Sequence, residues 1–357
     1  MKNTMLAPGK IRPSFDAPQE VPLGDGLRTN GFFGTRPANG ETVRPEQPAV
    51  RACRRVVASL MVALMLTSGF VHADVEVKDD SGATLHLAQP ARRIVALAPH
   101  LAETLFAAGA GDRLVGTVEY SDFPEAVKKV PRVGGYSRLD LEAVAALKPD
   151  LIIAWQSGNA PAHVDKLRAL GFPVYISQPN RIDDVAVEIE RFGTLAGTSR
   201  VANLAAAQFR QRLASLQKRY SQQPPVRTFY QIWKQPLMTV GGEQIISNVI
   251  RLCGGDNVFE KLGALAPTVT VEAVIAANPE AIIASGMGES RPEWLDDWKR
   301  WTSITAVARD NLFFVRPDLI QRHTPRLLDG AERLCQHLET TRSRRPHPKG
   351  ASSGARQ

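Results

Sequence analysis

Residues 142–154, with the sequence EAVAALKPDLIIA, return 130 residues later as residues 272–284, EAVIAANPEAIIA. Each copy predicts a short amphipathic helix that ends before a proline and is followed by a buried strand. Two copies are too few for a solenoid, so they indicate two similar α/β lobes. The alternative is a chance likeness of two short helix–strand segments. With two lobes, a ligand is expected between them, beyond the ends of the strands.

Short apolar runs alternate with helical patterns around both copies, which is typical of α/β architecture. Strands are predicted at residues 93–98, 114–117, 151–155, 174–177, 226–232, 281–284 and 313–315. Helices are predicted at residues 99–110, 139–147, 160–170, 183–196, 200–220, 245–253, 271–277 and 327–340. Trp294, Trp298 and Trp301 have helical spacing and are expected in the core.

The helix predicted at residues 200–220 decides how the lobes are connected. At 1.5 Å per residue it is roughly 30 Å long, the width of a small domain, and Thr198 or Ser199 can cap it. The predicted fold is therefore α/β, with two similar lobes joined by one long rigid helix. The boundaries are a first lobe at 74–197, the linking helix at 198–223, a second lobe at 224–340 and a basic disordered tail at 341–357.

Composition excludes several classes of protein. The chain has 357 residues, 43% hydrophobic and 22% charged, which is enough for two cores. Its net charge of +8 comes from the two ends, because residues 74–340 carry 30 Lys/Arg and 31 Asp/Glu. The basic surface of a nucleic-acid-binding protein is therefore not expected. Three cysteines are too few for a disulfide scaffold and lack zinc-ligand spacing.

The N-terminal region predicts export. Residues 51–73, RACRRVVASLMVALMLTSGFVHA, combine an arginine-rich start, an apolar run and small residues before a cleavage site near Ala73. A short membrane anchor is the alternative. Residues 1–50 then read as a leader ahead of the true translation start. Export to the oxidising periplasm allows Cys253 and Cys335 to form a disulfide, with two buried free thiols as the alternative.

Enzyme motifs are missing from the sequence. It contains no G-x-S-x-G elbow, no H-E-x-x-H and no P-loop. The histidines are scattered without the spacing of metal ligands. We therefore expect neither an enzyme nor a metal-ion binding protein.

Four stretches carry a resemblance to a known family: residues 93–99, 120–124, 141–155 and 253–259, with the sequences RIVALAP, YSDFP, LEAVAALKPDLIIAW and CGGDNVF. From about residue 92 to 338 the chain resembles the helical-backbone periplasmic substrate-binding proteins of ABC importers, which serve vitamin B12, haem and iron siderophores. The LKPDLI element is shared across that superfamily. YSDFP, and IIAW followed by Gly158 and Asn159, resemble the members that bind vitamin B12.

The resemblance implies a monomer that captures cobalamin between its lobes and has no cofactor of its own. It would deliver this ligand to an ABC permease and its ATPase at the inner membrane. Haem or a ferric siderophore is the alternative ligand, and His100, Tyr120 and His323 are available as iron ligands.

Residue by residue, the resemblance implies that cobalamin is held by aromatic faces and a few polar groups. The implied ligand-binding residues are Tyr120, Tyr136, Trp155, Phe229, Ile232, Trp233, Asp318, Leu319, Ile320, Gln321 and Arg322. Tyr136 stands where a tryptophan is usual. Ala266 precedes Pro267 where a Trp-Pro pair is common, so one stacking ring is missing there. Without the resemblance, a tryptophan that ends a strand would be expected in the core.

Glu142 and Glu272 occupy the same place in the two copies of the repeat. Such carboxylates can stabilise the first turn of a helix, behind Asp140 and Thr270 as caps. The resemblance implies that each also meets arginines of the permease.

Overall fold

A computed structural model describes residues 74–135, 137–286, 288 and 290–346. These residues belong to one compact unit, Phe70–Gln357. The predicted leader and signal peptide (residues 1–73), Tyr136 and residues 347–357 lie outside the described residues. No helix in the described ranges is long and apolar enough to cross a membrane.

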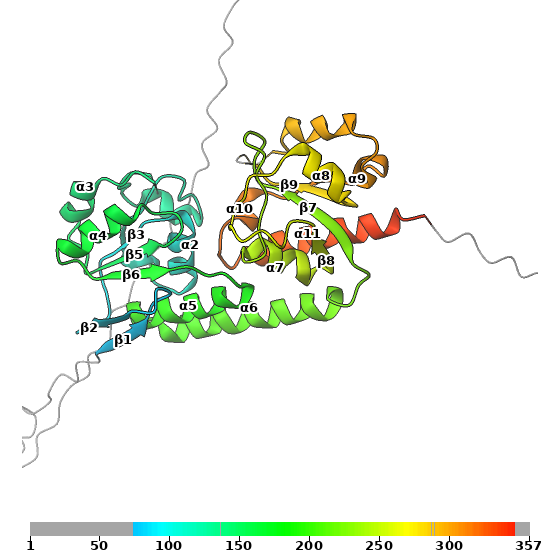
Figure 1. The fold of residues 1–357 in the computed structure, drawn as a ribbon. Coiled ribbons are helices and arrows are strands. Elements are labelled where there is room, and N and C mark those ends of the chain that lie inside the picture. Colours follow the sequence, from blue (N-terminus) through cyan, green and yellow to red (C-terminus); the bar gives the residue numbers. More distant parts are fainter. Residues whose placement is uncertain (1–73, 136, 287, 289, 347–357) are drawn as a thin grey trace, which may run out of the picture. The chain divides into compact units, whose positions relative to one another are not determined.

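The first lobe is built on a four-stranded parallel sheet with strand order β4-β3-β5-β6 (Figure 1). Its strands are β3 (Ile94–Ala96), β4 (Leu114–Gly116), β5 (Leu151–Trp155) and β6 (Val174–Ser177). Its helices are α2 (Pro99–Ala107), η1 (Gly111–Arg113), η2 (Glu125–Lys129), α3 (Leu141–Ala146), α4 (Pro161–Ala169) and α5 (Ile182–Ala196). An antiparallel hairpin precedes the sheet, formed by β1 (Val75–Lys78) and β2 (Thr84–Leu87).

The second lobe has its own four-stranded parallel sheet, with strand order β10-β9-β7-β8. Its strands are β7 (Val226–Gln231), β8 (Gly255–Asn257), β9 (Ala281–Ala284) and β10 (Leu312–Phe314). Its helices are α7 (Ile245–Leu252), α8 (Val271–Ala277), η3 (Glu293–Arg300), α9 (Thr305–Ala308), α10 (Pro317–Ile320) and α11 (Leu327–Ser343).

The two sheets have the same strand order once β3, β4, β5 and β6 are matched to β7, β8, β9 and β10. The repeated segment accounts for part of this likeness. Residues 141–150 and 271–280 have the same pattern of buried and exposed positions. Lys148 (φ 45°) and Asn278 (φ 41°) both turn the chain through the left-handed region just after the helix. The prediction of two similar α/β lobes is therefore confirmed.

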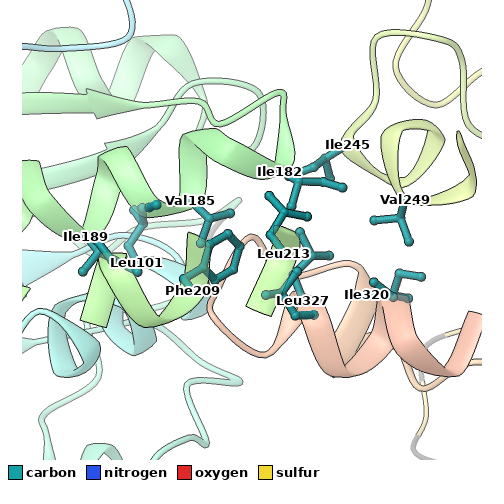
Figure 2. Packing of buried hydrophobic residues seen from close by; sticks show 14 of the residues in the cluster. Leu101, Ile182, Val185, Ile189, Phe209, Leu213, Ile245, Val249, Ile320 and Leu327 are labelled. Atoms are coloured by element: carbon teal, nitrogen blue, oxygen red, sulfur yellow. The ribbon is translucent and has the colours of Figure 1, made fainter. Parts of the chain in front are cut away.

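The linking helix is α6, Ser199–Tyr220, and it packs lengthwise on α5. Phe209 and Leu213 on its inner face join a single hydrophobic cluster that contains residues of both lobes. Figure 2 shows this packing, with Leu327 of α11 near Leu213. Neither predicted cap acts through its side chain. The Thr198 hydroxyl instead donates to the carbonyl oxygen of Ala108, 2.7 Å away, because this end of α6 lies against the end of α2.

The C-terminal boundary and three strands differ from the predictions. Helix α11 continues to Ser343, so a tail beginning at residue 341 starts too early. Arg342 holds this last turn by donating to the carbonyl oxygens of Pro224, Cys253 and Gly254. Strand β8 and the β1–β2 hairpin were not predicted, because β8 (Gly-Asp-Asn) has no apolar residue and the hairpin is only four residues deep. The tryptophan stripe lies on a 3₁₀ helix, and its buried member is Trp298.

Candidate ligand-binding cleft

A cavity of about 280 Å³ opens between the two lobes. Trp155, at the carboxyl end of β5, and residues 178–180, just after β6, form its first-lobe wall. Ile232, just after β7, and residues 244–246, at the start of α7, contribute the second-lobe wall. Both sheets therefore present the carboxyl ends of their strands to the cavity, where parallel α/β sheets bind ligands.

The lining of this cavity is polar but uncharged. Its polar side chains are the carboxamides Gln178, Asn180, Gln244 and Gln321, the hydroxyl of Ser157 and the imidazole of His323. Trp155, Pro179, Ile232, Ile245, Ile246, Leu265 and Ala266 supply its apolar surface. None of the described lining residues is Asp, Glu, Lys or Arg. The cavity therefore suits a ligand with a large apolar surface and neutral hydrogen-bonding groups.

Trp155 is fixed in place by the residues that follow it. Its backbone N–H donates to Oδ1 of Asn159 at 2.7 Å, and Nδ2 of Asn159 donates to the carbonyl oxygen of Leu97 at 2.9 Å. Gly158 lies directly against the indole, so that a Cβ at this position would be 1.8 Å from Cε3 of Trp155. Glycine and asparagine at these positions therefore hold a half-buried indole ring at the cavity wall.

Two histidines lie beside Trp155. The ring centroid of His100 is 5.0 Å from that of Trp155, and the ring centroid of His323 is 6.5 Å away, both in edge-on geometry. Burial lowers the pKa of His323 to about 4. Burial, with the nearby charges of His323 and Arg322, also lowers the pKa of His100 well below its ordinary value. Both imidazoles are therefore neutral at neutral pH.

Charged side chains lie beside the cavity, in pairs that cross between the lobes. Arg322 donates to Asp122 at 2.5 Å and to the carbonyl oxygen of Tyr120 at 3.0 Å. Burial alone would raise the pKa of Asp122, but its hydrogen bond with Arg322 and the charge of that residue lower it below the usual range. Arg326 donates to both carboxylate oxygens of Glu103 at 2.7 Å. These charges are matched by partners and are not presented to the cavity.

Comparison with models of protein families identifies the family of this chain. The model of a family described as "Periplasmic binding protein" matches residues 94–319. The chain belongs to the periplasmic binding protein family. This is a family of binding proteins, not of enzymes, and among the described residues no group of three or more His, Cys, Asp or Glu is placed to hold a metal ion.

This periplasmic binding protein matches named relatives over most of their length. A vitamin B12-binding protein of Vibrio campbellii is 37% identical over 256 residues, which are 72% of this chain and 92% of the relative. The crystal structure of a periplasmic vitamin B12-binding protein of Vibrio cholerae has a TM-score of 0.66 and 37% identity, covering 71% of this chain and 98% of that one. A periplasmic haem-binding protein of Pseudomonas aeruginosa has a TM-score of 0.60 and 25% identity, covering 72% and 95%.

The cavity of this periplasmic binding protein brings together three of the predicted ligand-binding residues, Trp155, Ile232 and Gln321. The first two end or follow a strand. Gln321 lies just after α10, and its side-chain Nε2 donates to Oγ of Ser285 and to the carbonyl oxygen of Gly286.

The other predicted residues that the structure describes lie outside the cavity lining. Tyr120 is 73% exposed, has a left-handed backbone (φ 63°) and stands on the loop that Arg322 contacts. Trp233 is 38% exposed and donates to the carbonyl oxygen of Gln235. Asp318 accepts from Arg316 and Arg326, and Leu319 is half-buried beside it.

Two predicted contacts are wrong. Phe229 has no exposed surface, because its ring packs against Phe259 and Trp298 in the core of the second lobe. It lies in the middle of β7, whose buried run the sequence could not assign to core or cleft. Ile320 is also fully buried, because α10 turns it into the core shared by both lobes.

Three of the four carboxamides of the cavity wall, Gln178, Asn180 and Gln244, were missed, because polar residues in loops carry no periodic signal. The backbone N–H of Gln178 donates to Oδ2 of Asp80 at 2.6 Å, so the unpredicted β1–β2 hairpin supports this wall. Oε1 of Gln244 accepts from the N–H of Ile246 and caps α7. The sequence signal for this position was a Gln directly before the apolar run of that helix.

The disulfide and the two repeat glutamates lie away from the cavity. Cys253 and Cys335 are bonded, with their Cα atoms 4.7 Å apart, which confirms the predicted bridge.

Glu142 and Glu272 are both exposed in the first turns of α3 and α8. Their helices are capped by Asp140, which accepts from Ala143 N, and by Thr270, which accepts from Ala273 N.

Proposed function

We propose that the protein captures cobalamin in the cleft between its lobes and delivers it to an ABC importer at the inner membrane. The observation that carries this proposal is the uncharged, carboxamide-rich lining of a cavity whose wall also holds Trp155. Cobalamin has a broad flat ring with neutral amide arms, and such a wall offers these arms hydrogen bonds without an unpaired charge. The vitamin B12-binding relatives support the same ligand.

The same lining favours haem less than it favours cobalamin. Its two carboxylates would enter a cavity whose described lining has no cationic side chain to pair with them. Arg322 and Arg326, which lie beside the cavity, already bind Asp122 and Glu103. A ferric siderophore with anionic groups meets the same difficulty.

The cavity would hold only part of the corrinoid, with the remainder in the opening between the lobes. Trp155 and Ile232 would contact the ring at the wall. Tyr120, exposed on its loop, and Tyr136 are proposed to cover it from the first lobe, and Trp233 from the second. Asp318, Leu319 and Arg322 would meet the amide arms at the rim. Ala266 lines the cavity and supplies no stacking ring there.

Delivery requires a surface that the permease can recognise. Glu142 and Glu272 occupy equivalent, exposed positions on the two lobes, so they suit a partner that also has two equivalent halves. The hydrophobic cluster common to both lobes and α6 would limit the opening motion to a few degrees. We propose that the protein acts as a monomer.

We also propose export through residues 51–73, with a mature chain that begins near Asp74 and a translation start near residue 50. The Cys253–Cys335 disulfide fits an oxidising compartment. The lobe boundaries at 74–197, 198–223 and 224 onward are part of this proposal.

Calorimetric titration of the protein purified from the periplasm tests the function. We expect one cyanocobalamin to bind per chain and haem to bind at least a hundredfold more weakly. Binding of haem without binding of cyanocobalamin would favour the haem-binding alternative and refute the proposal.

A further inference from the structure

Two buried histidines meet across the lobes beside the cavity. His100 is the second residue of α2 in the first lobe, and His323 lies between α10 and α11 in the second. Their ring centroids are 5.5 Å apart and their planes are inclined by 56°. His100 is 5% exposed and His323 is 7% exposed, and only His323 lines the cavity.

One ring nitrogen of each histidine is buried without a hydrogen-bond partner among the described residues. Nε2 of His100 and Nδ1 of His323 are buried, and neither has a partner within the described part of the chain. Buried polar atoms are paired in the great majority of cases, since an unpaired one costs about 1–3 kcal/mol. Two unpartnered nitrogens on neighbouring rings therefore point to a hydrogen bond that one imidazole can donate to the other.

The charge state of the two rings defines what they can offer. Because burial lowers both pKa values, each ring is neutral and carries one N–H and one lone pair. The charge of Arg322 also acts on His100, and Arg322 is itself paired with Asp122. A neutral imidazole does not attract a carboxylate, but it can donate an electron pair to an acidic N–H or to a metal centre.

The position of the unpartnered atoms selects one proton arrangement. With ring centroids 5.5 Å apart, Nδ1–H of His323 can donate to Nε2 of His100, which would satisfy both buried atoms at once. Nε2 of His323 is then deprotonated, and its lone pair is the one that this cavity-lining ring keeps for a further partner. His100 would in this way set the tautomer of His323, as a neighbour of an imidazole commonly does.

We propose that His323 contacts the ligand by donating the lone pair of its neutral imidazole Nε2 into the cavity, with His100 as the positioning residue that sets this tautomer. The inference rests on the proposed function, because the recipient would be an electron-pair acceptor of the corrinoid. Two parts of cobalamin have this chemistry: the N–H of an amide arm, and the axial position of cobalt when its ligand is exchangeable.

The test replaces the imidazole by a ring of similar size without nitrogen, in His323→Phe. Affinities for cyanocobalamin and aquacobalamin are measured by calorimetry, and the visible spectrum of aquacobalamin is recorded free and bound. Loss of one hydrogen bond or coordination bond should weaken binding by about tenfold. Equal weakening for both ligands, with an unchanged spectrum, assigns the amide arm. Weakening for aquacobalamin alone, with a spectral shift that only the unsubstituted protein produces, assigns cobalt.

Controls separate this role from a structural one. His86→Phe changes an exposed histidine of β2 and should leave both affinities unchanged. His323→Gln keeps a hydrogen-bonding group and should recover part of the loss for an amide contact. His323→Leu, which has no hydrogen-bonding group, replaces His323→Phe if that variant does not fold. His100→Phe should weaken binding in the unsubstituted protein but have no further effect in His323→Phe, as a double-mutant cycle would show.

Affinities within twofold of the unsubstituted protein in folded His323→Phe, or in folded His323→Leu if the phenylalanine variant does not fold, would overturn the inference and leave cobalamin binding intact. If the unsubstituted protein binds neither cobalamin, the proposed function fails and the inference fails with it. Weakening by His100→Phe that adds fully to that of His323→Phe would remove His100 from the positioning role.

Discussion

The guanidinium of Arg326 forms two parallel hydrogen bonds with the carboxylate of Glu103, from Nε and Nη2, each at 2.7 Å. Glu103 lies on α2 of the first lobe, and Arg326 directly precedes α11 of the second. The Glu103 side chain is only 3% exposed and that of Arg326 17%. Arg326 also lies over the ring of Phe123, 4.0 Å from its centroid. This pair therefore fixes the position of one lobe against the other beside the cleft.

Removing one partner of this pair should be costly. Glu103→Ala would leave a largely buried guanidinium with only Asp318 as its acid partner, and breaking buried pairs costs about 3–5 kcal/mol. Urea unfolding should show this loss in the free energy of unfolding. Arg210→Ala is the control, because Arg210 pairs with Glu190 at the surface and should cost less than about 1 kcal/mol. Equal, small losses in the two variants would contradict the assigned role of the Glu103 pair.

Gly158→Ala should weaken cobalamin binding more than it changes stability. The added Cβ would overlap the indole of Trp155 and force the ring away from the cavity wall. Gly263→Ala is a matched control, because nothing lies within 4 Å of a Cβ at that position. Calorimetry should show at least a tenfold loss of affinity for the first variant and none for the second. An unchanged affinity in Gly158→Ala would mean that the indole position does not matter for binding.

Loss of the disulfide should destabilise the second lobe. Cys253 and Cys335 are separated by 82 residues and join α11 to the residue that follows α7. Disulfides contribute about 2–4 kcal/mol, mainly by restricting the unfolded chain. In the Cys253→Ala, Cys335→Ala double variant, the free energy of unfolding should fall by that amount. The midpoint of urea unfolding should therefore lie at a lower urea concentration. A midpoint identical to that of the oxidised protein would show that the bridge contributes nothing to stability.

Acid should destabilise the protein through the two buried histidines. Folding lowers the pKa of His323 to about 4 and lowers that of His100 as well, whereas an unfolded histidine titrates near about 6.5. The unfolded chain therefore binds more protons from about pH 6.5 down to about pH 4. Within that window, the free energy of unfolding falls as the pH falls, by at most about 1.4 kcal/mol per pH unit for each histidine.

Glu188 acts in the opposite direction in the same window, because burial raises its pKa to about 8. The measurement therefore compares variants. Between pH 7 and pH 4.5, His323→Gln should lose less stability than the unsubstituted protein, and the exposed-site variant His86→Gln should follow the unsubstituted protein. Parallel pH profiles for all three proteins would rule out His323 as a source of acid sensitivity.

Charge reversal at the repeat glutamates should separate transport from binding. Glu142→Arg with Glu272→Arg should abolish cobalamin uptake by cells while calorimetry shows unchanged affinity. Glu293→Arg, which changes an exposed first-turn acid of η3, is the control and should leave uptake intact. Reduced affinity in the double variant would place these residues in binding instead of docking.

The sequence predicted the fold better than it predicted the site. The repeat at residues 142 and 272 indicated two like lobes because it carries both the helix pattern and the buried strand, and the structure matches it position by position. Strand β8 was missed because its strand character comes from pairing with β7, not from its own residues. Similarly, Phe229 was misplaced because a strand buried on both faces shows no alternation.

The cavity lining could be predicted only in part, for a physical reason. The resemblance implied Trp155 and Ile232, and both lie at or just after the carboxyl end of a strand, where the topology leads a ligand to be expected. Gln178, Asn180 and Gln244 lie in loops whose position depends on tertiary contacts, such as the hydrogen bond that the Gln178 N–H donates to Asp80. The resemblance also implied Asp318 and Arg322, yet their charges are matched by Arg326 and Asp122 respectively.

Diffraction from crystals of the protein grown with cyanocobalamin would locate the ligand. We expect a corrinoid between the lobes, with its ring edge against Trp155 and its amide arms within hydrogen-bonding distance of Gln178, Gln244 or Gln321. A corrinoid bound elsewhere on the surface, or crystals in which this cleft holds only solvent at saturating ligand, would contradict it.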